Sequence, residues 1–230
     1  LEGDGDLDVY LVQSGDLGTI GEPANANALF RNDGNGRFED VTAEAGDAGD
    51  RGYGMGVAAG DVDRDGYVDL YITNYGPDVL LRNNGDGTFS DVTKVAGLGH
   101  PGWGASAAFI DYDLDGLLDL AVTNYVQWTP DKAMSCPGPG GRPDYCAPNA
   151  YDAPSPDLIY RNEGNMRFRD VSVETGWRTA FGNGLGIVPL DYDDDGLPDL
   201  FVANDQRPNQ LWRNLGDGTF KDDADVVGVA

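Results

Sequence analysis

Basic residues, histidine, cysteine and long apolar runs are all scarce in this 230-residue sequence. The 15 Lys and Arg residues stand against 40 Asp and Glu residues, which gives a formal net charge of −25. This balance argues against a nucleic-acid or anionic-membrane partner, because both require clustered basic side chains. No run of 18 apolar residues occurs, so we expect no membrane insertion. The single histidine, His100, argues against a Ser-His-Asp triad and a His-rich metal site.

The two cysteines, Cys136 and Cys146, are too few for a disulfide-rich scaffold or for a zinc site. They flank a short Pro- and Gly-rich segment, and we predict one disulfide between them in an oxidising compartment. Because the chain begins at Leu1 without a signal peptide, we expect a mature form or a piece of a longer protein.

An aspartate-rich motif, Asp-x-Asp-x-Asp-Gly-x-x-Asp, occurs three times in full, starting at Asp61, Asp111 and Asp191. A second motif containing Arg-Asn occurs four times, with its arginines at Arg31, Arg82, Arg161 and Arg213. These arginines lie 51, 79 and 52 residues apart, so the period is near 50 residues with one insertion of nearly 30. Internal repeats of this length indicate a repeat architecture.

Each unit contains short apolar runs bounded by Gly, Asn and Asp, which predict strands. In the second unit these runs cover residues 56–59, 70–73, 79–81 and 89–92. Four short antiparallel strands in 50 residues favour an all-β propeller blade over a helical repeat. The sequence also leaves a short helical turn near residues 92–96 or 171–175 as an alternative to a strand or loop there.

We therefore predict one propeller domain over residues 1–230. Its repeats cover approximately 1–52, 53–102, 103–180 and 181–230, with an insertion over about 125–157. The strand that precedes each aspartate motif is missing at both chain ends, so we expect four blades that form an arc of a larger ring.

The aspartate motif has the ligand pattern of a calcium loop. Carboxylates at positions 1, 3, 5 and 9 alternate inward, Gly at position 6 permits a sharp reversal, and position 7 offers a backbone carbonyl. Six or seven such oxygens suit Ca²⁺, whereas Mg²⁺ prefers a smaller octahedron and Zn²⁺ prefers His or Cys. Acidic turns without a metal are the alternative.

We predict three complete calcium sites and a fourth that the N-terminus truncates. The first site uses Asp61, Asp63, Asp65, Tyr67 and Asp69. The second uses Asp111, Asp113, Asp115, Leu117 and Asp119. The third uses Asp191, Asp193, Asp195, Leu197 and Asp199, and the truncated copy uses Glu2, Asp4, Asp6 and Asp8. Because position 12 lacks a bidentate Glu, we expect dissociation constants of about 10⁻⁴ to 10⁻³ M and a structural ion.

Three other features lead to weaker expectations. The Arg-Asn motif is interpreted as a hairpin turn with a packed Phe, its arginine bonding backbone carbonyls between blades. We expect Trp103, Trp177 and Trp212 to pack between blades. The insertion is long for a loop, so binding and simple packing over the ring are both open. Aromatic residues typical of contact surfaces occur there, at Tyr125, Trp128, Tyr145 and Tyr151.

The repeats resemble the FG-GAP/VCBS family of calcium-binding propeller blades, which also occurs in integrin α-subunits. The resemblance rests on Phe181-Gly182-Asn183-Gly184 and on the loop from Asp191 to Asp199. Segments 144–148, 158–162 and 204–214 are similar to bacterial cartilage-acidic-protein-like proteins, which carry an ASPIC/UnbV domain. The resemblance implies a seven- or eight-bladed ring, a secreted, cell-surface or periplasmic location, and an adhesion or matrix role.

Three functions remain in competition. The first is a non-enzymatic, calcium-stiffened module that binds an extracellular protein or glycan, and we favour it because no convergent catalytic set is present. The second is a structural protomer of a surface layer, tube or filament, since an incomplete ring exposes sheet edges to copies of itself. The third, an enzyme that acts on a polysaccharide, rests on fold analogy alone.

Overall fold

The computed structural model describes residues 3, 5–14, 17, 26–49 and 52–230, and its main strands form four antiparallel units that we call blades 1 to 4. Blade 1 contains β1 (Val9–Leu11), β2 (Ala28–Asn32) and β3 (Phe38–Asp40). Blade 2 contains β4 (Tyr53–Gly60), β5 (Asp69–Pro77), β6 (Val79–Asn83) and β7 (Phe89–Asp91). Blade 3 contains β8 (Pro101–Ile110), β9 (Asp119–Asn124), β12 (Leu158–Asn162) and β13 (Phe168–Asp170). Blade 4 contains β14 (Gly184–Leu190), β15 (Asp199–Asn204), β16 (Gln210–Asn214) and β17 (Phe220–Asp222).

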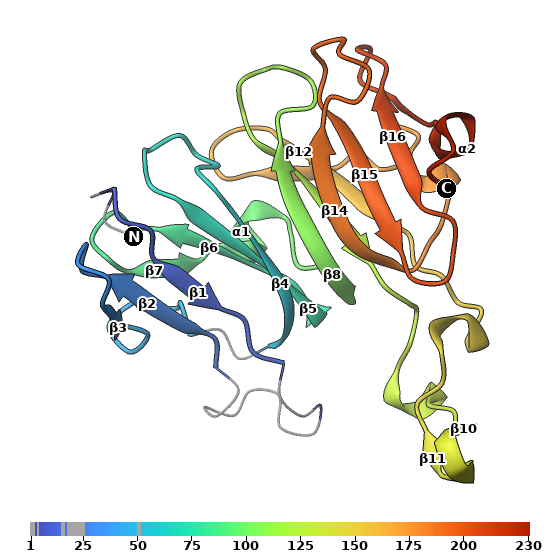
Figure 1. Cartoon of the computed structure of the whole chain (residues 1–230). Coiled ribbons are helices and arrows are strands. Elements are labelled where there is room, and N and C mark those ends of the chain that lie inside the picture. Colours follow the sequence, from blue (N-terminus) through green and yellow to red (C-terminus); the bar gives the residue numbers. More distant parts are fainter. Residues whose placement is uncertain (1–2, 4, 15–16, 18–25, 50–51) are drawn as a thin grey trace.

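The blades stand side by side in an arc (Figure 1), with the first strand of blade 3, β8, between the first strands of blades 2 and 4. The predicted all-β propeller arc is therefore confirmed. Blades 2 to 4 have four strands each, whereas blade 1 has three among the residues described. Blades 2 and 3 are also joined by backbone pairing between the end of β5 and the start of β8, where Tyr75 lies opposite Trp103.

Helical structure is confined to short segments. The first of the two helical turns that the sequence left possible forms as α1 (Thr93–Ala96). Over residues 171–175, the amide of Thr175 donates to the carbonyl of Val171 at 2.9 Å, which closes a single helical turn. The other short helices are η3 (Pro130–Lys132), η4 (Pro139–Gly141), η5 (Pro148–Ala150), η6 (Trp177–Thr179) and α2 (Ala224–Val227). Within the described part of the chain, none of the helices has the length and apolarity to cross a membrane.

The apolar core lies between neighbouring blades, because successive side chains of a strand point to opposite faces. On β5, Leu70 and Ile72 pack in the cluster shared with blade 1, whereas Tyr71 packs in the cluster shared with blade 3. This burial on both faces explains why the second strand of each blade reads as a nearly continuous apolar run. Trp177 and Trp212 are fully buried between blades 3 and 4, as predicted.

The two ends of each blade carry different connecting segments. Every complete aspartate motif connects the first strand of its blade to the second, so all three loops lie at one end of the arc, which we call the loop end. The insertion leaves from the opposite end. Its hairpin of β10 (Cys136–Pro137) and β11 (Pro143–Asp144) projects away from the blades (Figure 1).

Candidate functional site

The first aspartate of each motif holds its loop in a closed turn. A carboxylate oxygen of Asp61, Asp111 or Asp191 accepts a hydrogen bond from the Gly five residues later, at 2.9, 2.9 and 3.0 Å. These glycines have φ values of 92°, 87° and 84°, which a residue with a Cβ adopts with strain. The motif is therefore preorganised by its own backbone amides.

The aspartate at position 9 of each motif, which we call the ninth aspartate, connects the loop to the Arg-Asn hairpin through hydrogen bonds. Asp69, Asp119 and Asp199 are completely buried. One carboxylate oxygen accepts the amide of the second loop residue at 3.0, 3.2 or 3.1 Å. The other accepts the amide of the hairpin Asn at 2.8 Å in all three blades.

Burial changes the acidity of these ninth aspartates. Desolvation raises the pKa of Asp69 to about 6 and of Asp119 to about 7, and it raises the pKa of Asp199. Burial is the largest cause. The two backbone hydrogen bonds lower each pKa, and the nearby aspartates raise it by a smaller amount. A cation beside these groups would favour their charged form.

Each complete motif gathers three carboxylates whose oxygens lie within 4.8 Å of one another. The groups are Asp61, Asp63 and Asp69; Asp111, Asp113 and Asp115; and Asp191, Asp193 and Asp199. In the second loop, Oδ1 of Asp111 is buried and has no hydrogen-bond partner among the described residues. Hard oxygen ligands clustered in this way, one of them buried and unsatisfied, fit a divalent cation of the Ca²⁺ type.

The remaining predicted ligands lie at the edges of these groups. Asp65, Asp119 and Asp195 are not members of the three groups. Tyr67, Leu117 and Leu197 each donate a backbone amide to the aspartate at position 5 of their loop, at 3.0, 2.9 and 2.8 Å. In the truncated copy, Glu2 and Asp4 fall outside the described residues and Asp6 lies beside Gly34. Asp8 accepts the amide of Asn32 at 2.9 Å, which is the role of a ninth aspartate.

The predicted role of the motif arginine is wrong. Instead of bonding backbone carbonyls between blades, Arg82 pairs with Asp63 and Asp65 of its own blade, both at 2.7 Å. Arg161 likewise pairs with Asp113 and Asp115 at 2.8 and 3.3 Å. The physical reason is charge, because a guanidinium beside clustered carboxylates gains more from them than from neutral carbonyls.

In blades 3 and 4, the asparagine after the motif arginine makes the contact between blades that the arginine was expected to make. The side-chain amide of Asn162 in blade 3 donates to the carbonyl of Val62 in blade 2 at 2.9 Å. The amide of Asn214 in blade 4 donates to the carbonyl of Tyr112 in blade 3 at 2.7 Å. Both asparagines are 1% exposed, so these hydrogen bonds form in the protein interior.

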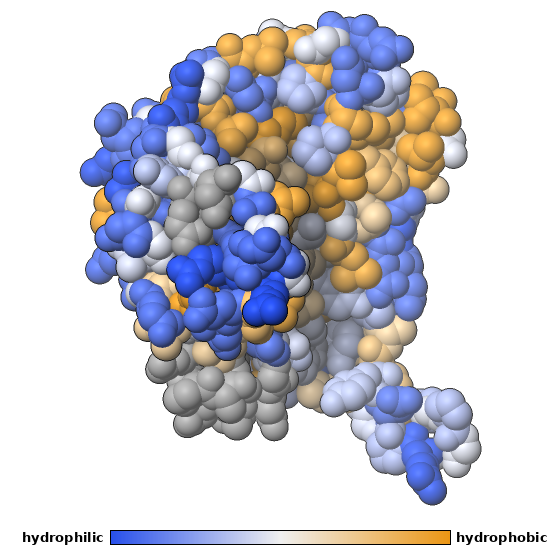
Figure 2. Space-filling view, turned by 60° about the vertical axis from the view of Figure 1, so that its left-hand side comes forward, coloured by the Kyte–Doolittle hydropathy of each residue, from blue (hydrophilic) through white to orange (hydrophobic). Residues whose placement is uncertain are grey.

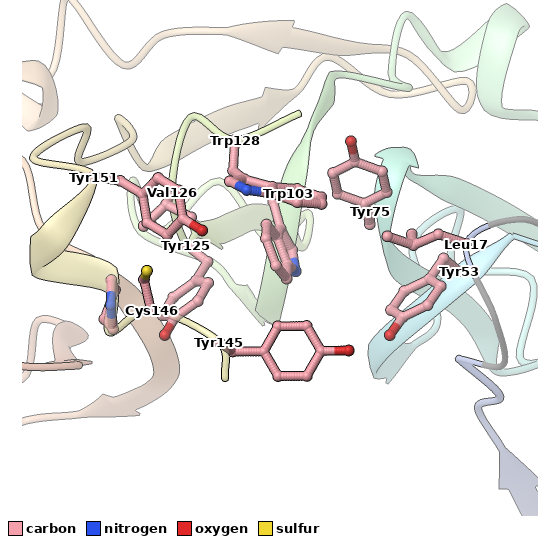
Figure 3. Close-up of a pocket in the computed structure, with 11 residues that line it drawn as sticks. Leu17, Tyr53, Tyr75, Trp103, Tyr125, Val126, Trp128, Tyr145, Cys146 and Tyr151 are labelled. Atoms are coloured by element: carbon pink, nitrogen blue, oxygen red, sulfur yellow. The ribbon is translucent and has the colours of Figure 1, made fainter. Parts of the chain in front are cut away.

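The predicted disulfide between Cys136 and Cys146 is present, with a Cα–Cα distance of 5.1 Å. It closes the β10–β11 hairpin of the insertion. The hairpin thereby brings Tyr145 and Cys146 next to side chains from blades 2 and 3 (Figure 3).

A cavity of about 540 Å³ lies at the end of the arc opposite the loops. Its aromatic walls come from two sources (Figure 3). Blades 2 and 3 contribute Tyr53, Tyr75, Trp103 and Tyr125. The rest of the insertion contributes Trp128, Tyr145 and Tyr151. The structure thus brings together all four aromatic residues that were predicted as contact residues.

Backbone pairing positions the blade residues of this cavity. Tyr53 lies opposite Tyr75 in blade 2, and the amide of Tyr125 donates to the carbonyl of Trp103 at 2.9 Å in blade 3. At the corresponding place in blade 4, the amide of Asp205 donates to the carbonyl of Asn183 at 2.9 Å. The aromatic pair is therefore a property of blades 2 and 3.

Sequence reasoning missed Tyr53 and Tyr75, and it expected only packing between blades from Trp103. Trp103 does contact Tyr75 of the neighbouring blade, at 5.3 Å between ring centroids, but it also lines the cavity. A usable signal was present. Tyr75 and Tyr125 each follow an asparagine and lie six residues after the last aspartate of their motif, and Tyr53 and Trp103 each lie between two glycines.

Comparison with known proteins gives a family and two partial likenesses. The FG-GAP-like repeat family matches residues 1–72, 61–122, 141–202 and 191–229. Cartilage acidic protein 1 of Homo sapiens is 33% identical over 101 residues, and that of Mus musculus is 32% identical over 101 residues. Each match covers 40% of this chain and 15% of the relative.

Among solved structures, an Agrocybe aegerita lectin described as recognising non-reducing terminal N-acetylglucosamine matches with a TM-score of 0.45 and 17% identity. That match covers 95% of this chain and 48% of the lectin chain. Because the family matches extend over nearly the whole sequence, the chain belongs to the FG-GAP-like repeat family.

Proposed function

We propose that this chain is an extracellular, non-catalytic binding module in which Ca²⁺ stabilises the loop end of each blade. The observation that carries the proposal is a group of three carboxylates in the same loop of blades 2, 3 and 4. Motif positions 1, 3 and 9 form it in blades 2 and 4, and positions 1, 3 and 5 form it in blade 3. Isolated acidic turns would have no reason to recur with the same Gly, the same buried ninth Asp and the same hairpin partner.

Electrostatics support a bound cation at each loop. The loop of residues 111–119 contains four aspartates, and Arg161 pairs with two of them, Asp113 and Asp115. The formal charge of this group is −3 when all four aspartates are ionised. Like charges held this close repel one another, and repulsion is stronger near a buried group such as Asp119. Ca²⁺ would offset most of this charge and accept the oxygen-only ligands.

The ion would act as a structural element. Asp69 and Asp199 belong to the carboxylate groups and also hold backbone amides of two different segments. A cation bound to such a group would join the loop and the hairpin of one blade. It would therefore add stability without needing an open coordination position for a substrate.

The insertion supports the proposed binding role and location. Its disulfide is the kind that forms and persists in oxidising compartments, which agrees with a secreted or surface-exposed protein. Tyr145 in its hairpin is 97% exposed, and an exposed aromatic residue on a projecting segment is a typical contact point. An extracellular protein or glycan is the proposed partner.

Calorimetric titration with Ca²⁺ tests the metal proposal. We expect three saturable sites in the described blades, and weaker binding of Mg²⁺ at the same concentrations. Asp113→Asn should remove one site, whereas Asp225→Asn, a change in the exposed residue of α2, should leave the number of sites unchanged. Equal titrations of the two variants, or no heat from Ca²⁺, would contradict the proposal.

Self-association is a second candidate, favoured by exposed apolar side chains on the first blade and on the helix that follows the last blade. Blade 1 exposes Leu7 by 84% and Phe38 by 50%, and α2 exposes Val226 by 76%. Figure 2 shows apolar surface gathered on the body of the molecule, while the projecting hairpin is mainly hydrophilic. Light scattering after size exclusion, with and without Ca²⁺, tests this candidate, and a monomer under both conditions would end it.

A further inference from the structure

The described residues that line the aromatic cavity include no charged and no amide side chain. Among the described residues that line it, the side chains are those of Tyr, Trp, Leu, Val, Pro and Cys. None of these lining residues is Asp, Glu, Asn, Gln, Lys, Arg or His. The polar side-chain atoms of the wall are therefore tyrosine hydroxyls and indole nitrogens, in a volume typical of small-molecule sites.

The rings meet edge to face, so their planes differ in orientation and the edge of one ring lies on the face of its neighbour. Trp103 lies 5.3 Å from Tyr75 at 79° and 5.3 Å from Tyr125 at 77°. Tyr53 meets Tyr75 at 6.3 Å and 82°. In Figure 3, Tyr145 extends below Trp103 toward Tyr53, so the rings surround a common space from different sides. Aromatic faces carry the negative part of the ring quadrupole, which attracts a cation.

The overall charge of the chain suits a cationic ligand, while Lys132 lines a neighbouring hollow that shares Tyr75, Trp103 and Trp128 with the cavity. The chain has a formal net charge of −25, so its field concentrates cations near the surface. Behind the cavity wall, the hydroxyl of Tyr125 donates to Asp205 at 2.7 Å.

We propose that this cavity binds a quaternary ammonium group, carried by a small molecule such as choline. A trimethylammonium group has no N–H, so it needs aromatic faces and no hydrogen-bond acceptor. Among the described lining residues, a primary ammonium would find no carboxylate for its three N–H donors, and a saccharide would find no carboxylate or carboxamide side chain.

This site goes beyond the proposed calcium and adhesion roles, because its walls lie at the opposite end of the blades and contain no predicted metal ligand.

Calorimetric titration of the whole chain in calcium-containing buffer tests the proposal with four probes. They are choline, ethanolamine, N-acetylglucosamine and 3,3-dimethyl-1-butanol, the neutral carbon isostere of choline. We expect choline to bind at least about fivefold more tightly than the isostere, the size of one cation–π contribution. Equal binding of the two, tighter binding of ethanolamine or the sugar, or no binding of choline would overturn the proposal.

Variants locate the site. Trp103→Leu should weaken choline binding by about tenfold or more, and Tyr145→Ala should weaken it severalfold without affecting folding, because Tyr145 is 97% exposed. Phe181→Leu is the matched control, since this half-exposed ring at the start of blade 4 lies outside the cavity. Choline binding that survives both cavity changes would overturn the assignment, and a calcium titration of each variant reports separately on the proposed metal sites.

Discussion

The loop end and the opposite end of the arc differ in how their side chains repeat. At the loop end, the Gly, the buried ninth Asp and the hairpin Asn have the same hydrogen bonds in blades 2, 3 and 4. At the opposite end, the corresponding pairs are Tyr53 with Tyr75, Trp103 with Tyr125, and Asn183 with Asp205. The first end repeats its chemistry, and the second repeats only its backbone pairing.

This difference has a physical basis. A ninth Asp receives two backbone amides that would otherwise be buried without a partner, so every blade needs one. At the opposite end, the backbone hydrogen bonds are made between main-chain atoms, and the side chains are free to differ. The repeated end stabilises the blades, and the variable end is where a specific ligand can be recognised.

Removal of calcium should have the largest effect and should act on the loop end. If each of three sites contributes about 1.4 kcal/mol at ten times its dissociation constant, chelation removes about 4 kcal/mol and lowers Tm by about 10 °C. Differential scanning calorimetry with and without chelator measures this shift. If Tm were the same with and without chelator, hydrogen bonding alone, and not a bound cation, would explain why the same aspartates recur at the loop end.

Loss of the hairpin asparagine should have the next largest effect. Asn162→Ala removes donors to the carbonyls of Val62 and Leu118 at 2.9 and 3.0 Å. Leaving these buried groups unpaired should cost about 2 to 3 kcal/mol of unfolding free energy, measured by urea denaturation. The exposed neighbour of another hairpin, Asn84→Ala, is the control and should cost much less. Comparable losses would argue against the contact between blades.

The buried Asp157 at the opposite end should give a smaller, pH-dependent effect. Its Oδ1 accepts the amide of Asn124 at 2.8 Å, a role that Asn209 fills for Asn204 in blade 4. Burial raises the pKa of Asp157 to about 7, well above the unfolded value of about 3.9. The folded state therefore binds the proton more tightly, and this stabilisation is complete below pH 4 and lost as the pH rises to 7.

Asp157→Asn removes this titration. We expect the variant to gain about 2 kcal/mol of unfolding free energy over the parent at pH 8 and almost nothing at pH 4. Urea denaturation across this pH range provides the measurement. A gain of equal size at both pH values would show that ionisation of Asp157 is not the cause.

Loss of the disulfide should have the smallest effect on stability. The hairpin strands β10 and β11 pair with each other and with no blade strand among those described. We therefore expect the double variant Cys136→Ser and Cys146→Ser to change Tm by less than about 2 °C, because the closed loop lies outside the core. If the variant melted far below the parent, the insertion would be part of the stabilising framework.

Much of the fold was predictable because its signals are local. The aspartate motif, the Asn- and Gly-containing hairpins and the apolar runs each specify a turn or strand within about ten residues. The disulfide was predictable because only two cysteines exist. The partner of each motif arginine was not, because Arg82 and Asp63 are 19 residues apart and meet only when the hairpin folds back onto the loop.

The sequence by itself determined the repeat, the strands within each unit and the carboxylate positions of the loops, since these depend on spacing along a short segment. Only the tertiary structure decided that Tyr75 of blade 2, Trp103 of blade 3 and Tyr145 of the insertion surround one cavity. The physical reason is that this proximity follows from pairing of β5 with β8 and from where the insertion folds, which no local pattern encodes.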